Sequence, residues 1–374
     1  MTLNRYRLGD LIELSYKKNE DELYGINDVK GISIKKKFIK TKANMDGVSL
    51  KRYLLVEPDS FCYVPTTSRN GEKITLAHNN TSNTYIVSSS YIVFKIKRKD
   101  LIISDYLFIY FCRPEFDRFS RFNSWGSARE VFQWSDMCDI NIDLPSIEIQ
   151  QKYVNIYNSM VENQKAYENG IEDLKLVCDA YIEELRRNMP CEKIEKYIIR
   201  QDKRNSDNTI KNVKSISVYK EFNSPSSKVN TKNLKNYKIV EPGEIAFVQT
   251  THNEKLLCCA INNTNKKILV SSVNEVFSTN NKLLPNYLML YLSRKEFDRY
   301  ARYHSWGSVR EIFNWDDMKN VKIPIPDIKI QKSISEIYKV YMQRKEINKI
   351  LKLQIKDICP ILIKGAIDEA KGVK

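Results

Sequence analysis

Short apolar runs and turn residues alternate over most of the chain. In YIVSSSYIVFKI (85–96) and KILVSSVNEVF (267–277), stretches rich in Val, Ile, Tyr and Phe are separated by Ser and Asn. This pattern is typical of short strands joined by turns. Residues 101–116 and 283–297 instead place apolar residues at helical spacing and predict short helices. The sequence therefore predicts two globular parts, residues 1–145 and 191–326, with a mixed α/β (α+β) fold that is mostly β-sheet.

Two other stretches predict long helices. The first lies between Pro145 and Pro190, and the second follows Pro326. In the first, apolar residues step by 4, 3, 4, 3, 4, which is the spacing of a coiled-coil seam: Tyr167, Ile171, Leu174, Cys178, Tyr181 and Leu185. In the second, a similar step runs through Ile330, Ile334, Ile337, Tyr341, Arg344, Asn348, Leu351, Ile355 and Ile358. Because proline interrupts helices, we expect Pro360 to close or kink the second helix and make the pair asymmetric.

The chain is a tandem repeat. RPEFDRFSRFNSWGSAREVFQWSDM (113–137) and RKEFDRYARYHSWGSVREIFNWDDM (294–318) are identical at 16 of 25 positions. The similarity continues upstream, from residues 53–67 to 237–251, and downstream, from 144–152 to 325–333. The two halves are therefore copies of one unit of roughly 180 residues, each with a globular part and a long helix.

The repeat suggests a geometry for the whole chain. Neither amphipathic helix is stable alone, and the simplest solution is that the two pack together. If they pack antiparallel as a coiled coil, a pseudo-two-fold axis relates the two copies. Duplex DNA has a similar dyad, and symmetric proteins read half-sites ~34–36 Å apart. Helices of 30 to 40 residues span roughly 45–60 Å. We therefore predict a covalent pseudo-dimer that reads a bipartite DNA site.

Composition agrees with a DNA-binding protein. The chain has 61 Lys and Arg against 46 Asp and Glu, a formal charge of +15, which suits a phosphate backbone. A lysine-rich surface that binds no nucleic acid is the alternative reading. There is no run of 18 apolar residues and no signal-peptide core, so we expect a cytoplasmic protein without a membrane partner. Eight cysteines without a CxxC pair and three scattered histidines predict reduced thiols and no metal site.

Motifs for catalysis are absent. The sequence has no GxxxxGK[ST], no GxGxxG that opens a helix, no GxSxG and no HExxH. We therefore predict no catalytic residues and no cofactor bound by this chain.

The loops differ most between the copies, and they carry the candidate DNA contacts. Residues 33–47 (SIKKKFIKTKANMDG) stand opposite 217–231 (SVYKEFNSPSSKVNT), and TTSRNGEK (66–73) stands opposite TTHNEK (250–255). A shared scaffold with different loops predicts that each half reads a different sequence. Lys and Arg can contact phosphates, and Arg, Asn, Ser and Thr can hydrogen-bond base edges.

The first candidates for base contacts are Arg69 and Asn70, with His252 and Asn253 as their counterparts. In an alternative interpretation, Asn70-Gly71 is only a hairpin turn. The other candidates in the first copy are Lys36, Lys37, Lys40, Lys42, Thr66, Thr67, Ser68 and Lys73. In the second copy they are Ser226, Ser227, Lys228, Thr250, Thr251 and Lys255.

The best-preserved element is Trp-Gly-Ser-x-Arg-Glu, residues 125–130 and 306–311. Arg129 and Arg310 are candidates for contacts with DNA or with a partner protein. The alternative is a shared turn in which Gly adopts an unusual backbone and Arg pairs with a carboxylate. Identity between halves that read different sequences favours the structural or DNA-backbone role.

Together these features resemble the specificity subunits of type I restriction–modification systems, over essentially the whole chain. The resemblance rests on YRLGDLIEL (6–14), on VKGISIKKKFIKTKAN (29–44), and on the EFDR segments followed by SWGSAREVF, WSDM and LPSIEIQQK. It implies target recognition domains at 1–145 and 191–326, and conserved spacer helices at 146–190 and 327–374. It also implies that residues 150–153 and 331–334 begin helices that face partner subunits.

The resemblance further implies partners that perform the chemistry. Two copies of a methyltransferase subunit would transfer methyl groups from S-adenosylmethionine to adenine N6 in double-stranded DNA. ATP-dependent restriction subunits would join them, so S-adenosylmethionine, ATP and Mg are expected in the partners. Three alternatives stay open: an orphan or phase-variable silent copy, a stand-alone DNA-modifying enzyme, and a structural coiled-coil scaffold.

Overall fold

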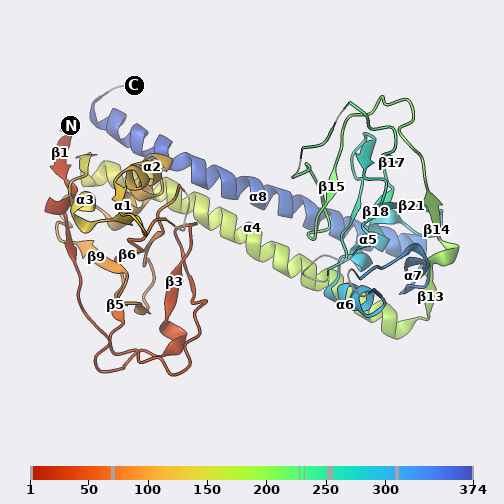
Figure 1. Cartoon of the computed structure of the whole chain (residues 1–374), viewed down its shortest axis with the longest axis horizontal. Coiled ribbons are helices and arrows are strands. Elements are labelled where there is room, and N and C mark those ends of the chain that lie inside the picture. The colour runs from red at the N-terminus through yellow and green to blue at the C-terminus, as the bar shows by residue number, and fades with distance from the viewer. Residues whose placement is uncertain are drawn as a thin grey trace. The chain divides into compact units, whose positions relative to one another are not determined.

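The structure is a computed structural model of the 374-residue chain (Figure 1). It describes residues 3–68, 72–226, 228–230, 232–250, 256–307 and 311–372. The chain divides into two compact units, unit 1 (Met1–Ala166 with Asn348–Lys374) and unit 2 (Tyr167–Ile347). Within the described ranges, no helix combines the length and the apolar character needed to cross a membrane.

Unit 1 is built on a four-stranded antiparallel sheet in the order β2-β9-β6-β7. Its strands are β2 (Ile12–Leu14), β9 (Ile92–Ile96), β6 (Phe61–Tyr63) and β7 (Leu76–His78). Four antiparallel pairs surround it: β1 (Asn4–Arg7) with β12 (Asn141–Leu144), β3 (Lys30–Ile32) with β4 (Phe38–Lys40), β5 (Leu54–Val56) with β8 (Tyr85–Val87), and β10 (Ser124–Trp125) with β11 (Val131–Phe132). Two 3-10 turns complete the unit, η1 (Leu8–Asp10) and η2 (Ile26–Asp28).

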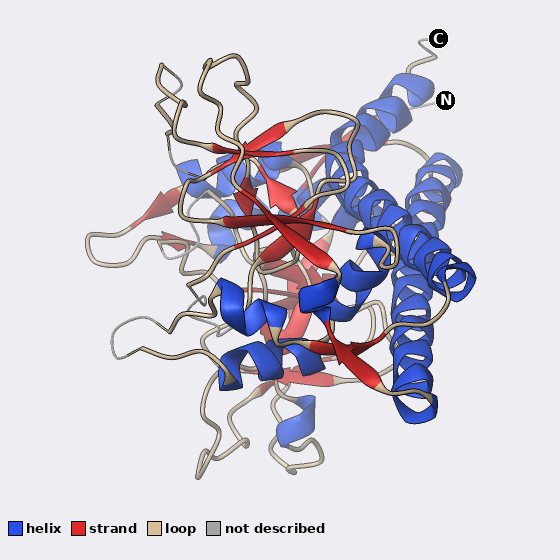
Figure 2. Cartoon of the chain, turned by 90° about the vertical axis from the view of Figure 1, so that its right-hand side faces the viewer, coloured by secondary structure: helices blue, strands red, loops and turns tan. Residues whose placement is uncertain are grey.

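Unit 2 repeats this topology. Its four-stranded sheet has the order β14-β21-β18-β19, from β14 (Ile198–Gln201), β21 (Glu275–Thr279), β18 (Ile245–Phe247) and β19 (Cys259–Ile261). Three smaller antiparallel pairs accompany it: β13 (Cys191–Lys193) with β22 (Lys322–Pro324), β15 (Ser215–Ile216) with β16 (Phe222–Asn223), and β17 (Lys238–Val240) with β20 (Ile268–Val270). The unit also has one 3-10 turn, η3 (Ile194–Lys196). The strands are short and are joined by long loops (Figure 2). The predicted mixed α/β fold is thus confirmed in both copies.

Each predicted short helix is in fact two helices. Unit 1 contains α1 (Ser104–Phe111), α2 (Pro114–Phe122) and α3 (Trp134–Cys138), and unit 2 contains α5 (Pro285–Leu292), α6 (Lys295–Tyr303) and α7 (Trp315–Lys319). The break falls at Arg113 and Arg294, which have extended backbone. Proline follows Arg113 and disfavours helical backbone there. Lysine follows Arg294, so the break belongs to the shared scaffold and does not require proline.

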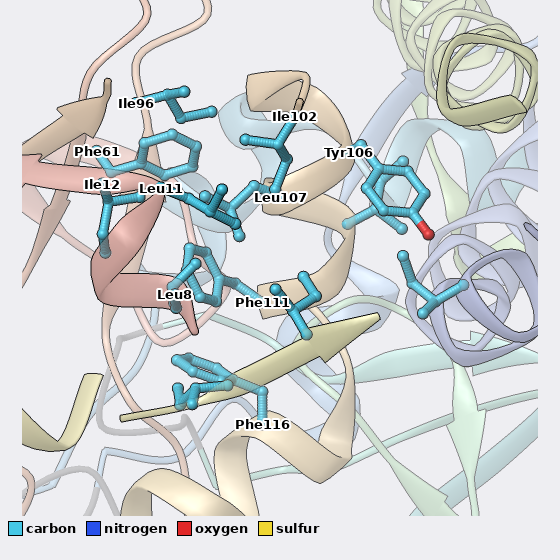
Figure 3. Close-up of a cluster of buried hydrophobic side chains, with 14 of the residues drawn as sticks. Leu8, Leu11, Ile12, Phe61, Ile96, Ile102, Tyr106, Leu107, Phe111 and Phe116 are labelled. Atoms are coloured by element: carbon cyan, nitrogen blue, oxygen red, sulfur yellow. The ribbon is translucent and has the colours of Figure 1, made fainter. Parts of the chain in front are cut away.

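The core of unit 1 lies between its main sheet and helices α1 and α2. Phe61 from β6, Phe111 from α1 and Phe116 from α2 are almost completely buried, and Figure 3 shows them with Leu8, Leu11 and Leu107. The equivalent cluster in unit 2 contains Phe247, Leu292 and Phe297, among others. Burial of each such side chain contributes ~1.5–3 kcal/mol, which is why the EFDR segments keep their phenylalanine.

The two long helices are α4 (Ile147–Asn188) and α8 (Ile328–Ala370). The expectation that Pro360 closes the second helix is wrong, because α8 continues through Pro360 to Ala370. Proline removes one backbone hydrogen bond there. Cys359, Leu362 and Ile363 are nevertheless buried in the core of unit 1, and this packing holds the helix on both sides of the proline. The helices are therefore nearly equal, at 42 and 43 residues.

Within each unit the helices pack antiparallel, as predicted. In unit 1, the Lys152 ammonium lies 2.8 Å from Glu369, and Gln164 donates a buried 2.8 Å hydrogen bond to Asn348. Residue numbers therefore rise along α4 as they fall along α8. In unit 2, the Arg344 guanidinium lies over the ring of Tyr167. The pseudo-two-fold axis and the four domain boundaries stay predictions.

The seam differs from the predicted one at three positions, one of which is the exposed Arg344. Tyr181 is 43% exposed and Ile182 is buried instead, since Ile182 packs with Cys178 in the core of unit 2. Ile330 is also exposed, whereas Ile334 is buried. A heptad pattern alone does not show that these turns pack on a globular core rather than on the other helix.

A buried glutamine joins each long helix to its globular part. The Gln150 amide accepts the Ile103 N–H at 3.0 Å and donates to the carbonyls of Leu101 and Pro145 at 2.8 and 2.9 Å. Gln331 makes the same three contacts, with Leu284, Lys282 and Pro326. Both glutamines are fully buried. Gln150 and Gln331 therefore satisfy backbone groups of their own units, and the partner-facing role of the helices that they begin stays a prediction.

This contact predicts a specific loss of stability. Gln150→Leu leaves a buried N–H and buried carbonyls without their partner, and each such group costs ~1–3 kcal/mol. The exposed neighbour Gln151→Leu should stay within ~0.5 kcal/mol of wild type. Urea denaturation of the full chain measures both variants. An equal effect of the two substitutions would contradict the assigned role of Gln150.

Candidate nucleic-acid interface

The β6–β7 connection, residues 64–75, carries many of the candidate residues of unit 1. Its first part runs beside β11, because the Thr67 N–H donates to the Glu130 carbonyl at 2.9 Å and the Phe132 N–H donates to the Pro65 carbonyl at 2.9 Å. Thr67 is buried, and its hydroxyl also donates to the Glu130 carbonyl. Ser68 is exposed. Thr67 thus holds the connection in place, while Ser68 is open to a ligand.

The β18–β19 connection has the same arrangement in unit 2. The Phe313 N–H donates to the Gln249 carbonyl at 2.8 Å, and Thr250 pairs with Ile312. Both connections therefore leave the sheet beside the Trp-Gly-Ser-x-Arg-Glu element of their own unit. Eight candidates lie outside the described residues: Arg69, Asn70, Ser227, Thr251, His252, Asn253, Lys255 and Arg310.

Lys36 is buried, although the sequence suggested a phosphate contact. Its ammonium lies 2.6 Å from Asp117 on α2 and donates to the Ile74 carbonyl at 3.2 Å. Lys36 has a positive φ of 56° in the turn of the β3–β4 hairpin. The Asp117 carboxylate also accepts the Ile74 N–H at 3.4 Å. One ion pair therefore ties together the hairpin turn, the end of the β6–β7 connection and helix α2.

Lys220 repeats this arrangement in unit 2. Its ammonium lies 2.6 Å from Asp298 on α6 and also donates to the Leu257 carbonyl, and its φ is 63°. Burial lowers the pKa of Lys220, but the nearby Cys259 and Asp298 raise it by more, so that the pKa lies above its ordinary value. Lys220 therefore stays charged. The Asp of each EFDR segment is conserved between the copies because it receives this lysine.

Most of the other candidate lysines of unit 1 lie at its surface. Lys37, Lys40 and Lys42 are exposed, and Lys73 and Thr66 are half-buried. Lys40 stands directly opposite Lys30 in the β3–β4 hairpin. Like charges across a strand pair are unfavourable alone, and an anionic ligand would relieve their repulsion. Lys30 was not among the candidates predicted from the sequence, because its position opposite Lys40 depends on the strand register.

Unit 2 presents a different surface at the same place. The equivalents of Lys30 and Lys40 in its hairpin are Lys214 and Ser224, so the pair of opposed lysines is not repeated. Ser226 and Lys228 are exposed beyond the hairpin. The two units therefore share the buried Lys–Asp pair but differ in the polar groups that they expose.

The Trp-Gly-Ser-x-Arg-Glu element is a tight turn. Gly126 and Gly307 have φ of 142° and 144°, and a Cβ on Gly126 would lie 2.2 Å from the Arg129 carbonyl oxygen. The turn therefore requires glycine. Glu130 pairs with Arg121 of α2 rather than with Arg129, which is exposed. The unusual glycine backbone is as expected, and the arginine that pairs with the carboxylate comes from outside the element.

His78 belongs to a polar cluster found in unit 1 only. Its ring lies 3.3 Å from both Asp59 and Asp105 and stacks on Phe61. Burial lowers the pKa of His78, but the two carboxylates raise it by more, and contact with His78 lowers the pKa of both aspartates. The cluster lines a pocket of about 460 Å³. The equivalent positions of the second copy hold Gly243, Ile261 and Asn286.

Among the described residues, no group of His, Cys, Asp or Glu side chains is arranged to hold a metal ion. All eight cysteines are free, in line with the predicted reduced thiols. The two units present different polar loops on the same fold, an arrangement suited to binding.

Comparison with known proteins gives the following relatives. Residues 191–357 match the family described as "Type I restriction modification DNA specificity domain". The crystal structure of a type I restriction–modification S subunit from M. genitalium is 11% identical, with 98% of this chain and 96% of that chain covered and a TM-score of 0.58. This likeness shows a shared fold. None of the curated protein sequences that were compared matches the chain.

Two further solved structures align along most of the chain with lower TM-scores. The HsdS subunit from Thermoanaerobacter tengcongensis is 14% identical, with 100% of this chain and 97% of that chain covered and a TM-score of 0.39. A structure described as the basis of complex assembly and conformational transition of the type I R-M system is 13% identical, with coverage of 98% and 97% and a TM-score of 0.46.

The buried Lys–Asp pair predicts a large effect on stability. Lys36→Met leaves the Asp117 carboxylate buried without its cation, and such a change costs ~3–5 kcal/mol. The double variant Lys36→Met/Asp117→Leu should recover much of this loss, because an apolar pair replaces the ion pair. Lys37→Met, at the exposed neighbour, is the control. Chemical denaturation of the full chain measures all three, and a Lys36→Met variant as stable as Lys37→Met would refute the assignment.

Proposed function

We propose that the chain reads a bipartite DNA site for a type I restriction–modification complex, because its residues 191–357 match the family of type I restriction modification DNA specificity domains. The chain is the DNA sequence-recognition subunit of such a system and not its catalyst. The observation that carries the proposal is the repeat: one scaffold occurs twice, with different polar loops on each copy.

Each unit reads one half of the site in this proposal. In unit 1, Lys37, Lys40, Lys42 and Lys30 contact phosphates, and Ser68 and Lys73 lie on the connection that reaches bases. In unit 2, Ser226, Lys228 and Thr250 take the equivalent places. The candidates outside the described residues complete both loops: Arg69, Asn70, Ser227, Thr251, His252, Asn253 and Lys255. The formal charge of +15 supports a phosphate-rich ligand.

The long helices are the proposed docking site for methyltransferase subunits. Helix α4 leaves Ile156 and Leu176 exposed, and α8 leaves Ile350, Leu353 and Ile361 exposed. Apolar side chains that do not pack in their own units support contacts with partner helices. Two copies of the methyltransferase subunit fit a chain with two equivalent units, and ATP-dependent restriction subunits join this core.

All chemistry belongs to the partners in this proposal. S-adenosylmethionine in the methyltransferase subunits supplies the methyl group for adenine N6. ATP and Mg serve the restriction subunits, and this chain binds no cofactor. Because its ligand is cellular DNA, the proposed location is the cytoplasm.

A methylation map of cellular DNA tests the proposal. Cells that carry the neighbouring methyltransferase gene are compared with and without this chain, with an early stop codon in its gene as the matched control. We expect N6-methyladenine in a split motif only when the chain is made. Absence of new methylation despite co-purifying subunits would identify a silent copy. Methylation or cleavage by the purified chain alone would identify an enzyme.

A further inference from the structure

Each unit exposes large aromatic side chains at the end of the EFDR helix. In unit 1, Phe122 at the end of α2 is 78% exposed and Trp125 in β10 is 69% exposed. In unit 2, Tyr303 at the end of α6 is 79% exposed and Trp306 is 74% exposed. Four such side chains in water forgo the burial that normally accompanies aromatic residues. We call each group, together with the polar residues described next, an aromatic face.

The two aromatic faces have the same chemistry. Glu115, Arg118, Phe119 and Phe122 lie on one side of α2 at positions i, i+3, i+4 and i+7, and Trp125 follows. The second copy has Glu296, Arg299, Tyr300, Tyr303 and Trp306 at the equivalent positions. Arg118 lies 3.4 Å from Glu115, and Arg299 lies 3.2 Å from Glu296. Charge, ring and spacing are therefore retained at all five positions.

Folding does not explain this conservation. The opposite side of α2 already packs in the core through Phe116 and Ser120, and α6 does so through Phe297 and Ala301. The glycine of the following turn is required by its backbone, since a Cβ on Gly126 would meet the Arg129 carbonyl. Neither core packing nor the glycine backbone explains why both tryptophans are retained at exposed positions. We therefore attribute their conservation to a contact outside the unit.

The retained residues of the two aromatic faces call for one kind of ligand in both units. The exposed loops nearby differ between the copies, as expected for two different half-sites. A surface that stays the same must meet the DNA backbone twice or one kind of protein twice. A phosphate contact calls for unpaired cations, whereas here a carboxylate stands beside each arginine. Trp, Tyr and Arg are instead the residues that dominate binding at protein interfaces.

We propose that each aromatic face docks one copy of the methyltransferase subunit, so that each recognition domain is held against its own partner. The inference rests on the proposed function and adds a second contact to the one on the long helices. The partner surface must offer an apolar pocket for the tryptophan ring.

Binding of purified methyltransferase subunit to the full chain, without DNA, tests the inference. Titration calorimetry compares wild type with Trp125→Ala, Trp306→Ala and the double variant. We expect each single substitution to weaken one of the two bound copies by at least roughly 10-fold and leave the other unchanged. The double variant should weaken both. Arg118→Glu and Arg299→Glu should act in the same direction, because they reverse a charge at the same faces.

The chain offers a matched control in each unit. Tyr16 in unit 1 and Tyr219 in unit 2 are 73% and 72% exposed, outside the aromatic faces. Tyr16→Ala and Tyr219→Ala should bind the methyltransferase subunit as wild type does. All variants should keep the wild-type urea midpoint, since the substituted side chains are exposed.

The outcomes separate this inference from the proposed function. Tryptophan variants that bind the subunit normally would overturn the inference alone. If such variants also lost affinity for duplex DNA, the aromatic faces would be DNA contacts. A wild-type chain that does not bind the methyltransferase subunit at all would overturn both the inference and the proposed function.

Discussion

A buried lysine–aspartate ion pair holds the recognition loops of each unit in place. Lys36 and Lys220 sit at positive φ in hairpin turns, and each reaches an aspartate of the EFDR helix at 2.6 Å. Each ammonium also binds a carbonyl near the end of the connection that carries candidate base contacts. Charges buried this deeply are costly unless paired, so the pair fixes three segments relative to one another. The loops between these anchor points are then free to differ in sequence.

The long helices are also held by a buried polar contact that occurs once in each unit. Each unit combines a globular part with one segment of α4 and one segment of α8. A buried glutamine joins the start of one helix to the loop before α1 or α5. These hydrogen bonds lie on the side of each helix that faces its globular part. The outer sides of the helices make no contribution to them. Their exposed apolar residues, and the exposed tryptophans of the aromatic faces, are the parts of the molecule that the fold does not require.

Much of this architecture could be predicted from the sequence, because the repeat and the apolar patterns are local signals. The strands at 85–96, the two long helices and the need for glycine in the Trp-Gly-Ser turn followed from neighbouring residues. The role of Lys36 did not follow, since its partner Asp117 is 81 positions away and charge alone suggests a surface contact. The end of the second long helix was also predicted wrongly. Burial of the neighbours of Pro360 in the unit 1 core outweighs the hydrogen bond that proline removes, so the helix continues.

The central claim is that one scaffold reads two half-sites through two sets of loops. The most direct measurement uses a chain in which residues 191–326 are replaced by a second copy of residues 1–145, made with its methyltransferase subunit. Sequencing of N6-methyladenine should then give a motif in which both halves carry the first half-site, in inverted orientation. A motif that keeps the original second half-site would contradict the account.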